Sequence, residues 1–387
     1  MRTADCISLG TPSTIMGKSQ DHPSGAENFT WDEKEWEMSE KYKPDVVKMV
    51  PVDDELLKTI PFKAVVKKIA VAEKGSAGLN PPWEVSCTNR MADCNRIVKP
   101  FHFAYNEYDG RRHTWNLVFE AYELGDLRTW RNKNFGWRDS VKVSKVLPEA
   151  HLWRFLVHMT QALAVMHDQK GSTHKHRGTL LHSDIKPDNI LVADNGSAYP
   201  SFRLHDFDFA TVAHGRQDRR APAFCGTFVW HPPEAPYVKT TWADVWAVGA
   251  SLHWLAFGEK VVPPMSANWM DDLAEEDREI ALKFRKRYAT EQKFYDALGP
   301  RIVSPINLGK PSRIAEKHPE FTRFFEPLYR PKYSDRLNFW MMECLKFDPA
   351  ERVTVDRLMK EMVPEARAVV LDLGGDAALT DFDLVFL

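Results

Sequence analysis

Residues 181–191 (LHSDIKPDNIL) constrain this chain more than any other stretch, because they place a loop dense in polar groups between two short strand-like runs. The loop sets a carboxylate, an ammonium and an amide at fixed offsets, on Asp184, Lys186 and Asn189. Phosphoryl transfer uses a carboxylate to accept a hydroxyl proton, a cation to neutralise charge, and an amide to hold a metal ion. A turn with a chance Asp and Asn is the alternative interpretation.

This loop resembles the catalytic loop of the eukaryotic protein kinases. The resemblance implies an α+β, bilobal protein kinase-like fold, with a small β-rich N-terminal lobe and a larger, mainly helical C-terminal lobe. It also implies ATP and Mg²⁺ as cofactors, Asp184 and Lys186 in catalysis, Asn189 as a metal ligand and His182 in a structural role. Kinases usually have Arg where this chain has Ser183, so the resemblance includes a departure.

A second stretch, Leu204–Asp208, places Asp206 seventeen positions after Asn189. It resembles the Asp-Phe-Gly element of kinases, which implies that Asp206 binds the metal and that Phe207 packs beneath it. Asp208 replaces the usual Gly and so removes a residue that tolerates positive φ. We therefore expect this loop to switch less easily between active and inactive forms. An exposed acidic turn is the alternative.

A third stretch, Cys225–Glu234, resembles the end of the kinase activation segment, where a peptide substrate binds. The resemblance implies that Thr227 bonds the catalytic Asp and Lys and favours Ser/Thr substrates. It also implies that Glu234 forms a bidentate pair with Arg352. A surface ion pair of little energetic value is the alternative. Asp244, which opens an apolar stretch, matches the buried acceptor that braces the catalytic loop.

Two departures from the family concern regulation. In kinases with Arg before the catalytic Asp, that Arg commonly binds a phosphate added to the activation segment. Here Ser183 takes the Arg position, and Ala223 takes the usual acceptor position. Within residues 211–225, Thr211 is the only residue with a hydroxyl group. We expect an activation segment that is ordered without phosphorylation or is regulated differently.

The N-terminal part of the chain resembles the family less clearly. Residues 65–68 (VVKK) resemble the strand that carries the phosphate-binding Lys, which implies Lys67 as the ATP ligand and Val65 as a wall for adenine. If the strand motif is shifted by one residue, Lys68 becomes the ATP ligand instead. Glu84 is the candidate partner of that Lys, and a solvated helix residue is an equally good interpretation of it.

The glycine-rich loop that covers the phosphates in kinases is not recognisable. No glycine occurs between Gly25 and Gly75, and Asp53-Asp54-Glu55 lies near the position where the loop is expected. Carboxylates there would repel phosphates, and side chains would block close approach of the backbone.

Residues 117–127 (LVFEAYELGDL) resemble the hinge between kinase lobes. The resemblance implies that the backbone of Glu120 and Tyr122 faces adenine, with Phe119 as the gatekeeper, and that Asp126 reaches the ribose. An ordinary strand followed by a loop is the alternative.

Length and composition allow a two-lobe globular enzyme, since the chain has 387 residues, 43% of them hydrophobic and 27% charged. Residues 1–45 are polar with few aliphatics, and we assign them to a flexible N-terminal tail. The kinase-like domain is assigned to residues 46–363, with lobes at 46–120 and 121–363. Residues 364–387 are assigned to a C-terminal tail.

Charge and cysteine content limit the partners. A net charge of -2 favours neither nucleic acid nor an anionic membrane, and no apolar run approaches the length of a membrane helix. The five cysteines are an odd number without zinc-ligand spacing, which is typical of reduced thiols. We expect a cytoplasmic or nuclear protein that acts on a protein substrate.

Three functions fit these residues. An active Ser/Thr protein kinase is favoured because the catalytic and metal-binding groups occur together. A pseudokinase scaffold is the second, since the glycine-rich loop is missing. A kinase of small molecules such as choline or aminoglycosides is the third, and the peptide-binding stretch argues against it.

Overall fold

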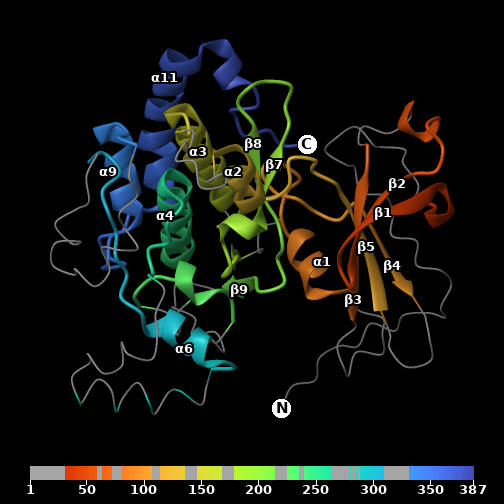
Figure 1. Cartoon of the computed structure of the whole chain (residues 1–387), viewed down its shortest axis with the longest axis horizontal. Helices are drawn as coiled ribbons and strands as arrows, with labels where there is room; N and C mark the ends of the chain where they lie inside the picture. The colour runs from red at the N-terminus through yellow and green to blue at the C-terminus, as the bar shows by residue number, and fades with distance from the viewer. Residues whose placement is uncertain are drawn as a thin grey trace, which may run out of the picture. The chain divides into compact units, whose positions relative to one another are not determined.

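The computed structural model describes residues 31–58, 63–71, 81–106, 114–135, 146–167, 178–213, 225–234, 239–263, 288–308 and 331–387, together with residues 275, 279, 282 and 285. The chain divides into two compact units (Figure 1). The N-terminal unit comprises Met1–Val85 and Lys99–Ala121, and the C-terminal unit comprises Ser86–Val98 and Tyr122–Leu387.

An antiparallel sheet of five strands builds the N-terminal unit, in the order β1-β2-β3-β5-β4. The strands are β1 (Trp36–Lys43), β2 (Val46–Pro51), β3 (Val65–Val71), β4 (His102–Asn106) and β5 (Thr114–Glu120). Two short 3-10 turns, η1 (Glu33–Glu35) and η2 (Leu56–Lys58), precede β1 and β3. Helix α1 (Trp83–Thr88) crosses the boundary between the two units.

The two faces of strand β3 have different environments. Val65 is fully buried and packs in an apolar cluster with Val118. Lys68 lies opposite Leu117 of β5, and Leu117 belongs to a separate apolar cluster. Because side chains alternate along a strand, Lys67 shares the face of Val65, and Lys68 lies on the other face.

The sheet begins earlier than the sequence predicted. Strand β1 lies within residues 1–45, which we assigned to a flexible tail. Only Trp36 of this strand is buried, so the strand carries little apolar signal. The turn between β1 and β2 contains Pro44 and Asp45. Residues 53–55, near which the phosphate-covering loop was expected, follow β2 and therefore lie outside the turn between β1 and β2.

Helices dominate the C-terminal unit. They are α2 (Leu127–Phe135), α3 (Glu149–Met166), α4 (Thr241–Phe257), α6 (Glu291–Leu298), α9 (Asp335–Cys344), α10 (Val355–Arg357) and α11 (Val363–Gly374), with a π-helical segment at Leu358–Met362. Short 3-10 turns occur at η3 (Pro187–Asn189), η4 (Phe228–Trp230) and η7 (Asp376–Leu379). This sheet-containing unit and this helical unit confirm the predicted α+β, bilobal protein kinase-like fold.

Helices α3 and α4 form the centre of the C-terminal unit and pack against each other. Nearly every residue of α3 is buried, and α4 is apolar on almost all sides, as a central helix should be. The Thr240 hydroxyl accepts a hydrogen bond from Ala243 N–H at the start of α4, and Gly258 ends the helix at φ 80°. These caps fix the position of the first turn of α4, which carries Asp244.

Two small antiparallel sheets flank the predicted catalytic loop and the segment that carries Asp206. Strand β6 (Thr179–Leu181) pairs with β9 (Thr211–Ala213), and β7 (Ile190–Ala193) pairs with β8 (Ser201–Leu204). Ile190 lies opposite Leu204, so the catalytic loop enters this hairpin at the end where the Asp206 segment leaves it.

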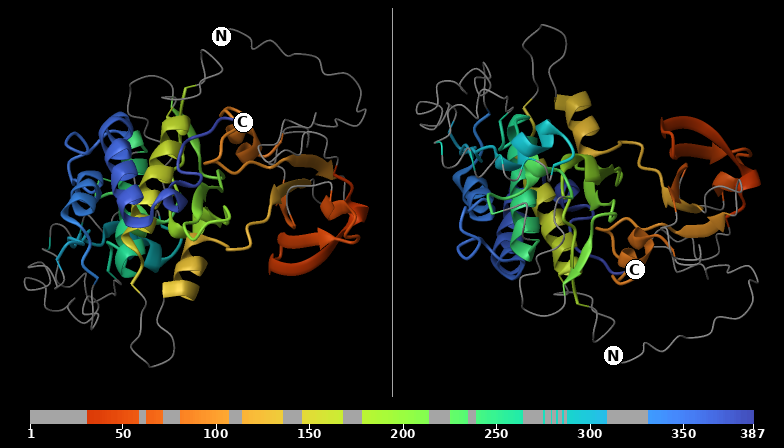
Figure 2. Two further views of the ribbon diagram at one scale, coloured as in Figure 1. Left: turned by 90° about the horizontal axis from the view of Figure 1, so that it is seen from above. Right: turned by 90° about the horizontal axis from the view of Figure 1, so that it is seen from below.

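The residues assigned to a C-terminal tail are ordered in helix α11, in η7 and in the backbone that follows. Helix α11 packs against α3, and the two helices lie close together in the views of Figure 2. Phe382 is 1% exposed, which places it inside the core of the unit. In the described part of the chain, no helix combines the length and the apolar character needed to cross a membrane.

Candidate active site

Asp244, in the first turn of α4, anchors the predicted catalytic loop. Its Oδ2 accepts hydrogen bonds from the N–H of His182 at 3.0 Å and from the His167 ring at 3.2 Å. Its Oδ1 accepts one from the N–H of Ser183 at 3.1 Å. Burial raises the pKa of Asp244, but the hydrogen bonds and nearby positive charge outweigh burial and hold the pKa below its usual value. The bracing contact expected of Asp244 is present.

The ring of His182 connects the loop to the Asp206 segment. Its Nδ1 accepts a hydrogen bond from the N–H of Asp184 at 3.3 Å, and its Nε2 lies 3.0 Å from the carbonyl oxygen of His205. The ring is fully buried and lies 4.9 Å from the ring of Phe207, centroid to centroid. His182 is therefore a structural link, and Phe207 packs below the loop as expected.

Asp184, Lys186 and Thr227 form one hydrogen-bonded group. Lys186 Nζ donates to Asp184 Oδ2 at 2.6 Å and to Thr227 Oγ1 at 2.8 Å. Asn189 donates from its amide nitrogen to the backbone oxygen of Asp184 at 3.0 Å and to Oδ2 at 3.1 Å. Asp184 Oδ1 is buried and accepts no hydrogen bond from any described residue. The carboxylate is thus held through Oδ2, and Oδ1 remains able to accept a proton.

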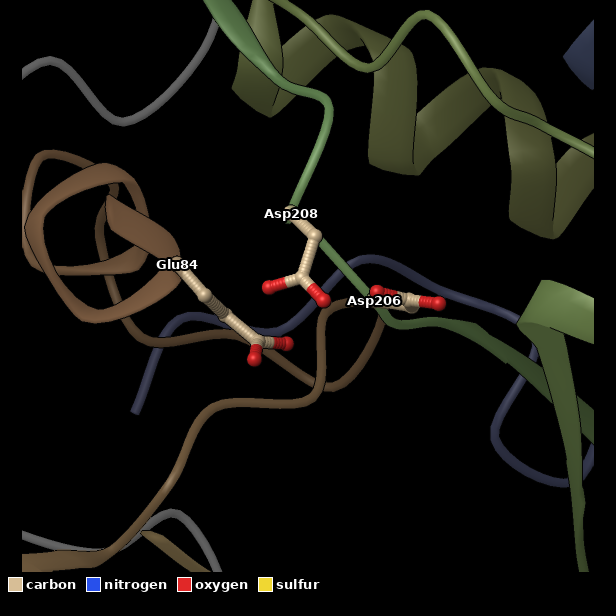
Figure 3. A group of neighbouring side chains, drawn as sticks. All are labelled: Glu84, Asp206 and Asp208. Atoms are coloured by element: carbon tan, nitrogen blue, oxygen red, sulfur yellow. The ribbon is translucent and has the colours of Figure 1, made fainter. Parts of the chain in front are cut away.

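The predicted metal ligands lie at the β7–β8 hairpin. Asn189 uses its amide nitrogen on Asp184, which leaves the amide oxygen as its possible metal ligand. Asp206 has φ 65°, a left-handed conformation that is uncommon outside glycine. Figure 3 shows Asp206 and Asp208 on the segment that follows β8. Carboxylate and amide oxygens are ligands that suit Mg²⁺, so the chemistry of Asn189 and Asp206 fits this ion.

The ion pair predicted between Glu234 and Arg352 is present. Arg352 donates from its two terminal nitrogens to the two oxygens of Glu234, at 2.7 and 3.0 Å. The Arg352 side chain is fully buried, stacks on Trp246 and also donates to the carbonyl oxygen of Trp242 at 2.9 Å. A bidentate pair with a fully buried Arg352 and a partly buried Glu234 is a structural contact rather than a surface ion pair.

Gly226 allows the activation segment to approach the catalytic loop closely. It has φ +87°, and a Cβ at this position would lie 2.6 Å from the carbonyl oxygen of Ser183, which no side chain could tolerate. Ser183 itself has φ 68°. Ala223 lies outside the described residues, and Thr211 lies in β9, so the absence of a phosphate switch stays a prediction.

The lysine and glutamate of the N-terminal unit pair differently from the main prediction. Glu84 of α1 (Figure 3) is 3% exposed and lies 2.8 Å from Lys68 Nζ. Lys67 Nζ instead lies 2.6 Å from Glu33. The expected pair of Lys67 with Glu84 is therefore wrong, and the alternative register is present. Val65 shares the face of Lys67, so the proposed adenine wall does not lie on the face of Lys68.

The hinge residues have several observed contacts. The Ala121 N–H donates to the carbonyl oxygen of Ala64 at 3.0 Å, and the Gly125 N–H donates to that of Tyr122 at 2.9 Å. Both carboxylate oxygens of Asp126 accept hydrogen bonds from Thr129, each at 2.8 Å. Asp126 therefore caps α2, which competes with the ribose contact predicted for it. The adenine contacts of Glu120 and Tyr122 stay predictions.

Sequence reasoning missed Arg301, which holds the backbone of the predicted substrate-binding stretch Cys225–Glu234. It is 8% exposed and donates to the carbonyl oxygens of His231 and Phe228, each at 3.1 Å. It also donates to those of Ala297 and Gly299. Burial lowers its pKa to about 10. All four acceptors are backbone atoms, so no pattern of side chains could have revealed this residue.

A family model described as the protein kinase domain matches residues 58–363, which is more than half of the chain. Mitogen-activated protein kinase kinase kinase 18 of Arabidopsis thaliana is 23% identical over 334 residues, covering 79% of this chain and 84% of the relative. Dual specificity mitogen-activated protein kinase kinase mek-2 of Caenorhabditis elegans is 26% identical over 227 residues, covering 56% of this chain and 50% of the relative.

Serine/threonine-protein kinase stk11 homolog of Dictyostelium discoideum is 34% identical over 96 residues, covering 22% of this chain and 14% of that protein. The chain therefore corresponds to only part of the Dictyostelium and nematode proteins.

Proposed function

Because the chain belongs to the protein kinase family, we propose that it transfers the γ-phosphoryl group of ATP to Ser or Thr hydroxyls of protein substrates. One observation carries the proposal: Lys186 joins the carboxylate of Asp184 to the hydroxyl of Thr227, while Asp184 Oδ1 accepts no hydrogen bond from the described residues. A binding module without catalysis would have no use for a buried carboxylate oxygen kept available in this way.

Asp184 and Lys186 have separate roles in the proposed reaction. The substrate hydroxyl donates its proton to Asp184 Oδ1 while its oxygen attacks the γ-phosphorus, and the bond from that phosphorus to the oxygen of ADP breaks. Lys186 neutralises charge on the transferred group and keeps Oδ2 hydrogen-bonded. Since the catalytic carboxylate is held by Lys186 and Asn189, it needs no reorganisation during the step.

We assign the nucleotide and the metal ion to the remaining residues of the site. Asn189 and Asp206 would hold Mg²⁺, which would neutralise the phosphate oxygens when bound. Lys68, fixed by Glu84, is the proposed phosphate ligand in place of Lys67. The backbone of Glu120 would bind adenine.

Thr227 supports Ser and Thr as acceptors, because its hydroxyl is fixed by Lys186 at the catalytic carboxylate. The names of the relatives differ on this point, since one is a serine/threonine kinase and another is of dual specificity. Tyr-containing peptides therefore belong in the assay as a comparison.

A pseudokinase that binds partners is the second candidate. The observation in its favour is the hairpin of β1 and β2, in which neither strand nor turn contains a glycine. Backbone N–H groups reach phosphates most easily where no side chain intervenes, so this hairpin lacks the usual means of covering ATP.

The deciding experiment measures Mg²⁺-dependent transfer of phosphate from ATP to a library of Ser/Thr peptides. We expect the wild-type chain to be active and Asp184→Asn to lower kcat about 10²–10⁴-fold, the range for loss of a general base. Asp188→Asn is the matched control, because Asp188 lies in the same loop but pairs with Arg128. We expect that variant to stay within about threefold of wild type, since its carboxylate takes no part in the step.

Tight binding of ATP without transfer by the wild-type chain would favour the pseudokinase. Equal activity of wild type and Asp184→Asn would contradict the role given to Asp184. A folded chain that neither binds nor uses ATP would overturn both candidates.

A further inference from the structure

Residues 376–387, the C-terminal strap, follow α11 and lie beyond the region that matches the family model. The strap pairs with residues 93–98, the linking segment, which lie between α1 and β4. Asn95 N–H donates to the carbonyl oxygen of Val385 at 3.1 Å, and Leu387 N–H donates to that of Asp93 at 3.0 Å. The backbone of the strap is therefore hydrogen-bonded along one edge of the linking segment.

Arg96 fixes the strap to the linking segment through a fully buried guanidinium. Its Nη1 lies 3.2 Å from the Asp381 carboxylate, and its Nη2 donates to the carbonyl oxygens of Asp381 and Asp383 at 2.7 and 2.8 Å. Its Nε donates to Gln161 of α3 at 2.6 Å. Asp381 also accepts a hydrogen bond from the Asn95 amide at 2.5 Å. Every side-chain nitrogen of Arg96 thus donates a hydrogen bond, and among the described residues Asp381 supplies the only carboxylate that accepts one.

The other edge of the linking segment pairs with β8. Val98 N–H donates to the carbonyl oxygen of Leu204 at 2.9 Å, and Leu204 N–H donates to that of Arg96 at 2.9 Å. Leu204 is the last residue of β8, two positions before Asp206. Its partner in β7, Ile190, directly follows Asn189. Backbone hydrogen bonds therefore run from the strap, through the linking segment, to Leu204 and Ile190, which lie two positions before Asp206 and directly after Asn189.

We propose that the C-terminal strap is a positioning element for the metal ligands, in which Asp381 acts through Arg96 and the linking segment on the end of β8. The inference rests on the proposed function, since it concerns where Asp206 and Asn189 are held for Mg²⁺ and ATP. The carboxylate of Asp381 fixes the guanidinium of Arg96, and the backbone of Arg96 fixes Leu204.

The attachment of the strap does not depend on Asp381 alone. Arg154 of α3 donates to the carbonyl oxygens of Ala378 and Thr380 at 2.6 and 2.9 Å, and Gln161 donates to that of Phe382 at 3.1 Å. These contacts remain when the Asp381 side chain is changed. A substitution there can disturb the linking segment while the strap stays folded on α3.

The experiment compares Asp381→Asn with Asp383→Asn in the full chain. The same chemical change is made in both, but the Asp383 carboxylate faces Arg367 at the surface, and only its backbone contacts Arg96. Hydrogen exchange of the Val98 and Leu204 amides is measured first, without nucleotide. We expect exchange about tenfold faster in Asp381→Asn and unchanged in Asp383→Asn, because loss of the ion pair favours local opening.

The second measurement is the Mg²⁺ concentration that gives half-maximal phosphate transfer. We expect it to rise about tenfold in Asp381→Asn, with the peptide KM unchanged and with partial rescue by Asp381→Glu. If the strap only stabilised the fold, Asp381→Asn would lower the melting temperature without changing the Mg²⁺ concentration for half-maximal transfer. Unchanged amide exchange, or an unchanged Mg²⁺ requirement in an active enzyme, would overturn the inference.

If the wild-type chain transfers no phosphate, the proposed function is wrong, but the inference about the strap can still be tested. Protection of the amides of residues 204–208 by Mg²⁺ and ATP then decides the inference. We expect weaker protection in Asp381→Asn than in Asp383→Asn, and equal protection would contradict it.

Discussion

At the scale of single residues, Lys67 and Lys68 carry the same charge on adjacent positions and have different partners. Lys67 lies on the face of the sheet that carries Val65 and pairs with Glu33, whose side chain is 53% exposed. Lys68 lies on the opposite face and pairs with the buried Glu84. An exposed ion pair contributes little, whereas a carboxylate buried in a helix restricts its partner to one position. Only Lys68 is therefore held in the way a phosphate ligand needs.

Lys68→Met and Lys67→Met test this assignment as a matched pair. We expect Lys68→Met to lower kcat/KM for ATP about 10²–10³-fold, because a fixed positive charge on the phosphates is lost. Lys67→Met removes the same charge one residue away and should stay within about threefold of wild type. Steady-state kinetics with varied ATP gives both values. A larger loss in Lys67→Met than in Lys68→Met would restore the register first predicted from the sequence.

At the scale of elements, α4 holds the catalytic loop through the single carboxylate of Asp244. Asp244→Asn keeps the size of the side chain but turns an amide NH₂ toward backbone N–H donors of His182 and Ser183. A buried N–H left without an acceptor costs about 1–3 kcal/mol, so we expect the unfolding free energy to fall by about 3 kcal/mol. Urea unfolding at pH 7 measures it.

Asp335→Asn provides the control for α4, because it makes the same change in the first turn of a different helix, α9. We expect that control to change the unfolding free energy by less than about 0.5 kcal/mol, as surface substitutions usually do. Equal stabilities of the two variants would mean that the Asp244 hydrogen bonds do not hold the loop.

The same elements explain which parts could be predicted from the sequence. Asp184, Lys186 and Asn189 lie within six consecutive residues, so their chemistry was visible as a local pattern. Strand β1 was missed because all of its residues except Trp36 are exposed and mostly charged. Lys68 was placed second because alternation along a strand does not say which face meets α1. That choice depends on tertiary packing, which the local sequence does not encode.

At the scale of the whole molecule, the C-terminal unit buries several histidines that must stay neutral. Burial lowers the pKa of His151 and of His231 to about 4, and holds that of His158 well below its usual value. In the unfolded chain these rings titrate near 6.5. Between about pH 4 and pH 6.5 the unfolded state therefore binds more protons than the folded state. The contribution of each neutral ring to the free energy of unfolding is complete above about pH 6.5 and is lost as the pH falls.

We therefore expect the unfolding free energy to fall between pH 6.5 and about pH 4, by up to about 1.4 kcal/mol per pH unit for each such histidine. Urea unfolding at a series of pH values gives this slope. His151→Gln removes one titrating ring and should reduce the slope by about 1.4 kcal/mol per unit, whatever it does to stability at pH 7.5. Parallel slopes for wild type and His151→Gln would show that His151 is protonated in the folded protein, because only a ring that stays neutral there couples folding to this pH range.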